Sequence, residues 1–405
     1  MAAAQELEAE RPSGIVAMAL AVCFAAAMCE GLDIQAAGVA ASGIKAAFKP
    51  EPAALGLFLA AGNFGLLFGA VAGGRIADRI GRKAVLVTAI SAFGLCSALT
   101  AFASDMPSLI AIRVLTGLGL GGAMPNLIAL AADVSPDRSR NSAIALIYIG
   151  MPLGGAVASS IIFLAPGAEW RSVFLLGAAA PLVIAPLMAW LLPTGRPAPT
   201  PQARSGDPRL GFRAIFADGR LPRTLLLWVA FLLSNLTLHL MLSWLPLLLQ
   251  GRGLARSDAA FAQIGFNAGG AAAALLAGMA LDTRWRKASI AVSVTALPVA
   301  LFLLANAPAA AAQMFAVAVL LGAAILAASV ILYGMAGGLY PPQARGAGIG
   351  SAIGVGRLGS LAGPAFAAVL LAAGRSPQQI LTSVLPIVVA CGLCVALLAW
   401  RTPKA

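Results

Sequence analysis

The chain has 405 residues, of which 60% are hydrophobic and only 10% charged, and its mean hydropathy is +0.92. Such a composition excludes a soluble domain and is typical of a protein that crosses a membrane several times. The net charge of +12 is compatible with nucleic-acid binding or with a membrane protein whose basic residues lie in the loops on one side.

Twelve apolar segments follow one another along the chain, and each is long enough to cross the hydrocarbon layer of about 30 Å as a helix. The sequence therefore predicts an all-α membrane protein with twelve transmembrane helices. We place the spans at residues 14–41, 53–77, 83–103, 107–132, 140–165, 170–192, 223–250, 258–281, 287–306, 311–339, 344–372 and 378–400.

The first span contains two carboxylates, Glu30 and Asp33, in a stretch that is otherwise almost free of charge. An acid at membrane depth costs roughly 2.5 to 3.5 kcal/mol on insertion scales, so its presence indicates a function. The spacing of three residues also puts both acids on one face of a helix. The alternative is a helix that ends near Cys29 and leaves both acids among the headgroups, but apolar sequence resumes from Ile34 to Ala40.

The basic residues lie mainly in loops on one side of the predicted spans. If both termini are cytoplasmic, 19 of the 27 Lys and Arg residues face the cytoplasm, six face outward, and Arg113 and Arg357 lie within spans. This bias is the positive-inside pattern, so the charge indicates orientation in the bilayer and no nucleic-acid partner. We expect a multi-pass protein of a bacterial-type inner (plasma) membrane with both termini cytoplasmic.

Residues 193–222 change in composition to Pro, Gly, Arg and Ser, which no continuous helix tolerates. We therefore predict a six-helix bundle over 1–192, a cytoplasmic linker over 193–222 and a second six-helix bundle over 223–405. Short matches recur 204 or 205 positions apart in the two halves. Such a repeat indicates two pseudo-symmetric bundles with a substrate site at the midplane between them.

The loop after the second span reads Gly74-Arg-Ile-Ala-Asp78-Arg-Ile-Gly81-Arg82-Lys83. It resembles the loop signature of the major facilitator superfamily, Gly-x-x-x-Asp-x-x-Gly-Arg-Arg/Lys, at every position. The resemblance implies an inner-face gate. Asp78 can accept hydrogen bonds at the positive end of a neighbouring helix, while the two bases stay in water or pair with acids.

Within that superfamily, Glu30-Gly-Leu-Asp33 resembles the Asp-Gly-x-Asp signature of aromatic acid:proton symporters, with Glu in place of the first Asp. The same resemblance extends over residues 113–126, 242–246, 263–270 and 354–364, and it is greatest for the branch of 3-hydroxyphenylpropionate transporters. It implies a small aromatic carboxylate as substrate, either a hydroxylated phenylpropionate or a benzoate-like acid. It also implies a proton as coupling ion and no cofactor.

Two arginines lie at membrane depth and are candidates for binding the substrate carboxylate. Arg113 is about six residues from the outer end of the fourth span, hence roughly 9 Å deep, and Arg357 is roughly 18 Å above the inner start of the eleventh. For Arg113, a side chain that snorkels to the headgroups is an alternative, whereas Arg357 lies far from both surfaces.

Five more residues in spans are predicted to line the substrate site. His239, the only histidine, shares one face of the seventh span with Asn235 and has a suitable pKa range for moving a proton. A hydrogen-bonded packing role is the alternative for this histidine. The others are Trp244, Asn267 and Tyr148, and for the asparagines and Tyr148 interhelical hydrogen bonding is an equal alternative.

The charges expected at the site predict a mechanism. Glu30 and Asp33 balance Arg113 and Arg357, so an incoming carboxylate leaves one excess negative charge, which protonation of one acid removes. We therefore expect one-to-one symport by alternating access, with Arg357 as the preferred bidentate partner of the substrate and Glu30 as the preferred proton carrier.

Two other functions stay open. The segment from Gly150 to Gly155 partly resembles the glycine-proline signature of antiporter fifth helices, which fits a proton-coupled drug or metabolite exporter of the same superfamily. A membrane sensor without flux is the second alternative.

No enzyme activity, catalytic residue or metal site is predicted, because the loops contain no paired catalytic acids, Ser/His/Asp set or metal-ligand cluster. Cys391 and Cys394 have the spacing of a redox or zinc site but lie in the last span without a second ligand pair. The protein is expected to work as a monomer in the lipid bilayer.

Overall fold

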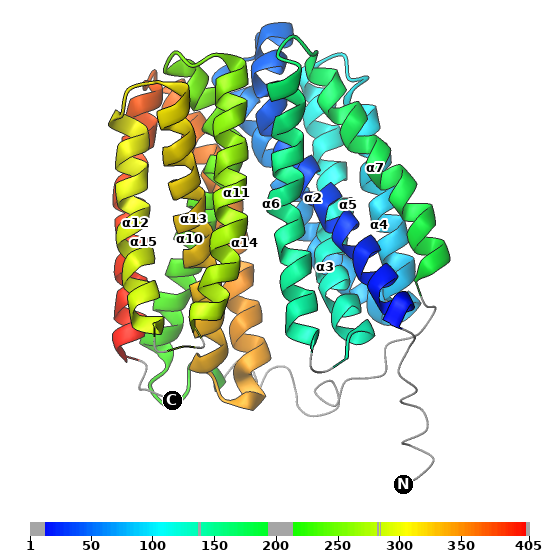
Figure 1. Cartoon of the computed structure of the whole chain (residues 1–405), viewed down its shortest axis with the longest axis vertical. Helices are drawn as coiled ribbons and strands as arrows, with labels where there is room; N and C mark the ends of the chain where they lie inside the picture. The colour runs from blue at the N-terminus through cyan, green and yellow to red at the C-terminus, as the bar shows by residue number, and fades with distance from the viewer. Residues whose placement is uncertain (1–12, 137–138, 193–213, 282, 284, 402–405) are drawn as a thin grey trace.

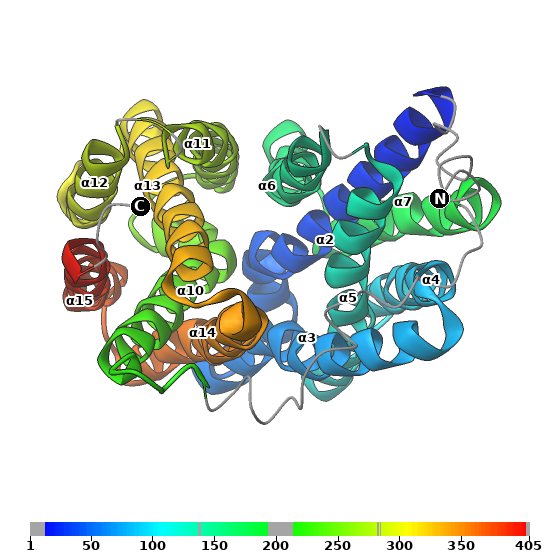
Figure 2. The ribbon, with the colours of Figure 1, turned by 90° about the horizontal axis from the view of Figure 1, so that it is seen from below.

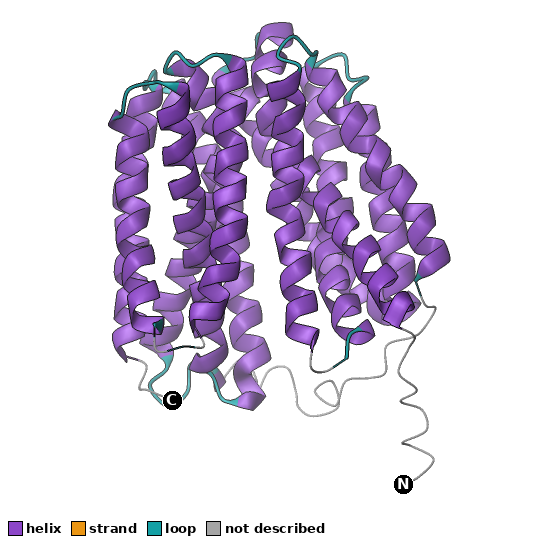
Figure 3. Ribbon diagram, viewed as in Figure 1, coloured by secondary structure: helices purple, strands orange, loops and turns teal. Residues whose placement is uncertain are grey.

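The computed structural model describes residues 13–136, 139–192, 214–281, 283 and 285–401, and within these ranges it contains helices and turns but no strand (Figure 3). Six helices precede residue 193: α2 (Ser13–Phe48), α3 (Pro52–Ile80), α4 (Arg82–Thr100), α5 (Met106–Val134), α6 (Arg140–Leu164) and α7 (Trp170–Leu191). Six follow the linker: α10 (Leu221–Gly251), α11 (Arg256–Leu281), α12 (Arg286–Asn306), α13 (Ala311–Leu339), α14 (Pro342–Ala372) and α15 (Pro377–Arg401). Each is long and apolar enough to cross a membrane, which confirms the prediction of twelve transmembrane helices.

Helix α2 is longer than its predicted span, because it continues to Phe48 instead of ending near residue 41. It ends where Lys49 adopts a left-handed backbone conformation, with φ of 46°, in front of Pro50, which disfavours the helical conformation in the residue before it. Glu30 and Asp33 therefore lie well inside a helix, and a helix that ends near Cys29 is excluded.

The helices form two groups that stand side by side (Figures 1 and 2). Helices α2–α7 make up one group and α10–α15 the other, which confirms the fold of two six-helix bundles. We call the face at which α2 begins and α15 ends the terminal face, and the other the opposite face. Residues 193–213 lie outside the described ranges and α10 already begins at Leu221, so the exact division at residues 193–222 stays a prediction.

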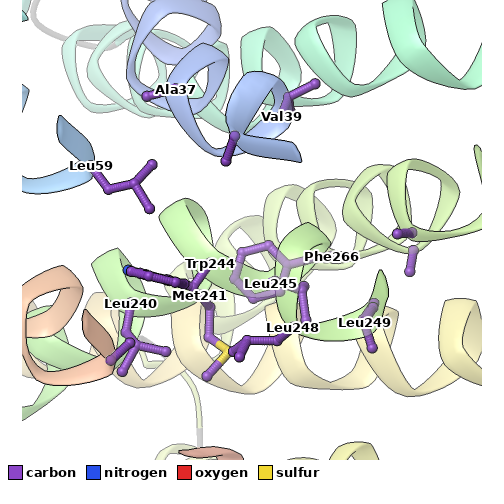
Figure 4. Packing of buried hydrophobic residues seen from close by; sticks show 14 of the residues in the cluster. Ala37, Val39, Leu59, Leu240, Met241, Trp244, Leu245, Leu248, Leu249 and Phe266 are labelled. Carbon is purple, nitrogen blue, oxygen red and sulfur yellow. The ribbon is translucent and has the colours of Figure 1, made fainter. Parts of the chain in front are cut away.

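The two groups contact each other through α2 with α10, α3 with α14 and α6 with α11. Figure 4 shows part of the apolar cluster at this interface, in which Ala37 and Val39 of α2 and Leu59 of α3 share a buried cluster with Trp244 of α10 and Phe266 of α11. These residues all lie in the half of their helix that is nearer the opposite face. Apolar packing therefore joins the two bundles on that side.

Helices α2 and α10 approach most closely at a glycine. A Cβ atom on Gly38 would lie 2.6 Å from the carbonyl oxygen of Ser243, closer than any side chain tolerates. Since Gly38 is on the opposite-face side of Glu30 and Asp33, the two acids lie on the terminal side of this contact.

Helix α5 begins at a side-chain cap on the opposite face. The Asp105 carboxylate accepts a hydrogen bond from the Ser108 backbone N–H at 2.7 Å, which satisfies an otherwise unpaired donor of the first turn. This bond lowers the pKa of Asp105, so the cap persists at neutral pH and is lost only as the pH falls through that lowered value. It defines the start of the helix that carries Arg113.

Candidate functional site

Asp33 and Arg113 form a buried ion pair between α2 and α5. The Arg113 Nη1 lies 2.8 Å from Asp33 Oδ2, and its Nη2 donates to the Asp33 backbone carbonyl at 3.1 Å. Both side chains are at most 2% exposed, and the guanidinium lies 5.8 Å from the ring centroid of Phe174 on α7. Snorkelling of Arg113 to the headgroups is therefore wrong, because its charge is neutralised inside the first bundle.

The ion pair leaves some hydrogen-bonding capacity unused. Asp33 Oδ1 and Arg113 Nε are buried and have no hydrogen-bond partner among the described residues. Arg113 also lines a small cavity of about 10 Å³ together with Asn63 and Ser243. A space of that size is at the limit of what one water molecule needs, so one water fits beside the pair.

Glu30 lies one helical turn before Asp33 on α2 but has no comparable partner. Its side chain is 1% exposed, and its Oε2 atom forms no hydrogen bond with a described residue. The cation that acts on Glu30 comes from the second bundle, because Glu30 interacts electrostatically with Arg357 of α14. The two acids thus occupy different electrostatic surroundings.

Arg357 is the free cation of the site. It is half-buried, and its guanidinium forms no hydrogen bond or ion pair within the part of the chain that the structure describes. Its field reaches four groups, namely Glu30, Tyr148 of α6, His239 of α10 and Tyr333 of α13. These groups come from both bundles, so Arg357 lies where the two halves face each other.

His239 and Asn235 lie on one face of α10, as the sequence indicates. The His239 Nδ1 atom is 3.1 Å from the Asn235 backbone oxygen, a contact within the helix, and the ring is 8% exposed. Trp244, one turn further along α10, is fully buried and donates from Nε1 to the Pro364 carbonyl of α14 at 3.1 Å. Its only hydrogen-bond donor is thus already used within the second bundle.

Asn267 takes part in a buried amide cluster, which we define as Gln35 of α2 with Gln263 and Asn267 of α11. Gln35 Nε2 donates to Asn267 Oδ1 at 2.8 Å, and Gln35 Oε1 accepts from Asn267 Nδ2 and from Gln263 Nε2, both at 2.9 Å. All three side chains are at most 3% exposed. The cluster therefore connects the two bundles.

Sequence reasoning overlooked Gln35 and Gln263. Two signals were present: Gln35 is an amide in a long apolar span, and Gln263 precedes Asn267 by four residues, which places both on one helix face. Neither signal says which helix carries the partner. That information comes only from the packing of α2 against α11.

The loop signature links helices within the first bundle. Gly81 has a positive φ of 92°, which favours glycine, and connects α3 to α4. Arg82 forms an ion pair with Asp133 at the end of α5, and Lys83 Nζ donates to the Leu192 carbonyl at 2.6 Å, next to the end of α7. The expected pairing of Arg82 with an acid is present, whereas Lys83 binds a backbone carbonyl.

The first two members of the signature differ in what the structure shows. Gly74 lies in α3, and a Cβ atom there would meet nothing within 4 Å. The backbone of Asp78 belongs to the same helix, but its side chain is outside the described part of the chain. The hydrogen bonds expected of Asp78 stay a prediction.

The described residues contain no group of His, Cys, Asp and Glu side chains that could hold a metal ion. All five cysteines are free thiols, and Cys391 Sγ contacts the Ala230 carbonyl at 3.6 Å.

The family model of the Major Facilitator Superfamily matches residues 23–308. The chain belongs to this superfamily. Among its relatives, the 3-(3-hydroxy-phenyl)propionate transporter of Escherichia coli (strain K12) is 36% identical, over 96% of this chain and 95% of that protein. The 4-hydroxybenzoate transporter of Pseudomonas aeruginosa is 31% identical over 90% and 88% of the two chains. A solved D-xylose-proton symporter has the same fold, with a TM-score of 0.74, 16% identity and 96% and 98% of the chains covered.

Membership of the major facilitator superfamily confirms the resemblance seen in the loop signature and in Glu30-Gly-Leu-Asp33. The family and the relatives are transporters, so this chain is a transporter and not an enzyme. Together with twelve apolar helices, the bacterial relatives support a multi-pass protein of a bacterial inner membrane.

Proposed function

We propose that this transporter imports an aromatic carboxylate together with a proton, and that hydroxylated phenylpropionates and benzoates are its substrate class. Two of the relatives are named as transporters of such acids, a hydroxyphenylpropionate and a hydroxybenzoate. Arg357 is the group that binds the substrate carboxylate, since a planar guanidinium without a partner matches a carboxylate in bidentate geometry.

The single observation that carries this proposal is the difference between the two arginines. Arg113 already has Asp33 as a counter-ion at 2.8 Å, whereas Arg357 has no ion-pair partner among the described residues. An anion that bound Arg113 would have to displace a buried carboxylate. An anion that binds Arg357 displaces no carboxylate, so its binding costs less free energy than binding to Arg113.

The same difference between the two arginines supports Glu30 as the proton carrier. When the substrate carboxylate neutralises Arg357, an ionised Glu30 loses the favourable field of that arginine and stays buried with an unpaired oxygen. A buried charge without a partner is costly, and protonation removes the cost. Asp33 keeps Arg113 throughout, so Glu30 takes the proton when substrate binds.

Alternating access would carry the substrate and the proton across the membrane. Two close contacts between the bundles lie in the halves near the opposite face, where Gly38 approaches Ser243 and Gln35 binds Asn267. We propose that the terminal face is cytoplasmic, in agreement with the positive-inside bias, and that rocking of the bundles opens each face in turn.

The test is uptake of radiolabelled 3-(3-hydroxyphenyl)propionate into proteoliposomes with an imposed inward proton gradient. Symport predicts accumulation above the external concentration, which a protonophore abolishes. Uptake that does not depend on the gradient would contradict proton coupling. Absence of saturable uptake would contradict the proposed substrate class.

Export of drugs has less support. The glycines that resemble an antiporter signature have a packing role here, because a Cβ atom on Gly154 would lie 1.9 Å from the Met28 carbonyl of α2. Resistance to toxic compounds after expression, without growth on aromatic acids, would nevertheless favour an exporter.

A further inference from the structure

Tyr148 of α6 and Tyr333 of α13 face each other across the two bundles. Their ring centroids are 6.5 Å apart, with the ring planes inclined at 47°. The ring of Tyr333 also packs at 5.1 Å, edge to face, against Phe231 of α10, which supports it from behind. The two rings therefore form a pair with one member from each half of the molecule.

The hydroxyl groups of this pair are free. Neither the Tyr148 nor the Tyr333 hydroxyl has a hydrogen-bond partner among the described residues, and the side chains are 45% and 38% exposed. The third tyrosine of the chain behaves differently, because Tyr340 is 3% exposed and its hydroxyl donates to Thr224 at 3.2 Å. Both hydroxyls are therefore available to donate to or accept from a ligand that enters between the bundles.

The pair lies in the same site as Arg357. Arg357 interacts electrostatically with both tyrosines, and Tyr148 also interacts with Glu30. Tyr148 is eight residues from the terminal end of α6 and Tyr333 six residues from that of α13, roughly 12 and 9 Å by the rise of a helix. Arg357 is 15 residues from the terminal end of α14, roughly 22 Å, so the rings lie on its terminal side.

We propose that Tyr148 and Tyr333 determine specificity for hydroxylated aromatic acids. The substrate carboxylate binds Arg357, the aromatic ring points toward the terminal face and packs beside the tyrosine pair, and the ring hydroxyl hydrogen-bonds to their phenol groups. This inference rests on the proposed function, because it presupposes that Arg357 holds the carboxylate. It adds the orientation of the substrate and the reason why a hydroxyl is preferred.

The proposal is tested with two acids that differ by a single hydroxyl, 3-(3-hydroxyphenyl)propionate and 3-phenylpropionate. Tyr148→Phe and Tyr333→Phe each remove a phenol group and keep the ring. We expect each variant to raise KM about fivefold for the hydroxylated acid, because one neutral hydrogen bond contributes roughly 1 kcal/mol. KM for 3-phenylpropionate should stay within a factor of about two, so the preference between the acids shrinks.

Tyr340→Phe is the matched control, since it removes a hydroxyl that is already bonded within the second bundle. It should leave the ratio of the two KM values unchanged. If the Tyr148 and Tyr333 variants also leave the ratio unchanged, or raise both KM values equally, the specificity role is overturned. Wild-type protein that takes up neither acid would instead overturn the proposed function, which separates the two failures.

Tyr333→Ala adds a test of the ring itself. It removes the stacking surface, so uptake of both acids should weaken. Since this variant can also disturb folding, its melting temperature in detergent is compared with that of Tyr333→Phe. A variant that melts normally and transports both acids as the wild type does would contradict placement of the substrate ring at Tyr333.

Discussion

Glu30 and Asp33 are three residues apart on one face of α2, yet their partners give them separate roles. Asp33 is held by the two hydrogen bonds from Arg113, whereas Glu30 is buried with an unpaired oxygen in the field of Arg357. The acid with the strong counter-ion stays charged at little cost. We propose that Glu30, which has no such counter-ion among the described residues, gains and loses the proton during transport.

Glu30→Gln should therefore separate binding from coupling. Glutamine keeps the size and polarity of the side chain but carries no titratable proton, so accumulation against a gradient should be lost while exchange of labelled for unlabelled acid persists. Both are measured in the same proteoliposomes. Glu51→Gln, which changes an exposed acid ahead of α3, is the control and should leave both activities intact. Normal accumulation by Glu30→Gln would show that Glu30 does not carry the proton.

Breaking the ion pair between Asp33 and Arg113 should lower the stability of the protein. Arg113→Gln leaves the Asp33 carboxylate buried and unpaired, which should cost about 3 to 5 kcal/mol of stability. Asp33→Asn in the same chain removes the stranded charge, so the double variant should recover much of the melting temperature in detergent. If the double variant is no more stable than Arg113→Gln, the two side chains are not coupled as the structure has them.

At the scale of elements, α2 carries the functional contacts to several neighbours at once. It holds the ion pair to α5, the glycine contact to α10 and the amide cluster to α11. The last two lie toward the opposite face and connect the bundles, so they must break when that face opens. Three buried hydrogen bonds among Gln35, Gln263 and Asn267 stabilise this closed arrangement.

Asn267→Leu should weaken closure at the opposite face. The substitution removes two hydrogen bonds from the cluster and leaves the Gln35 Nε2 donor without its partner, while Gln35 Oε1 keeps the bond from Gln263. Spin labels placed at Lys49 and Ala255, in an otherwise cysteine-free chain, should then report a larger population of long distances. Asn306→Leu is the control. The Asn306 Nδ2 donates to the Phe302 carbonyl of its own helix, so this bond does not join the two bundles. An unchanged distance distribution for Asn267→Leu would exclude the cluster as a closing contact.

For the whole molecule, Arg357 lies where the two bundles face each other and has no ion-pair partner among the described residues. We propose that movement of the bundles exposes this arginine to each side in turn. The loop signature belongs to this scale as well, since Arg82 and Lys83 tie α4 to the ends of α5 and α7 within one bundle. Those bonds help the first bundle to move as a unit. The contacts between bundles are then the ones that change.

The orientation of the whole molecule in the membrane can be tested with fusion proteins. If the terminal face is cytoplasmic, green fluorescent protein fused after Ala405 should fluoresce and alkaline phosphatase at the same place should be inactive. Phosphatase fused after Ala310, between α12 and α13 on the opposite face, should be active. The reverse pattern would invert the direction of transport that we propose.

Much of this molecule could be predicted from the sequence, because apolar length, loop charge and motifs are local properties. Hydropathy located all twelve helices, and the signature from Gly74 to Lys83 and the motif from Glu30 to Asp33 indicated the family. Side-chain partners were harder to predict. Both arginines were expected at the substrate site, with Arg357 preferred as the partner of the carboxylate, but the sequence did not show that Arg113 pairs with Asp33.

The sequence alone determined that the chain crosses a membrane twelve times in two halves and that costly charges lie inside the helices, since the bilayer imposes these features on any chain of this composition. Tertiary structure decided how those charges are paired. The packing of α2, α5 and α14 brings Arg113 to Asp33 across 80 residues of chain, and it leaves Arg357 without an ion-pair partner among the described residues while its field acts on Glu30. Pairing at that separation depends on helix contacts that hydropathy does not encode, and those contacts give each charge its role.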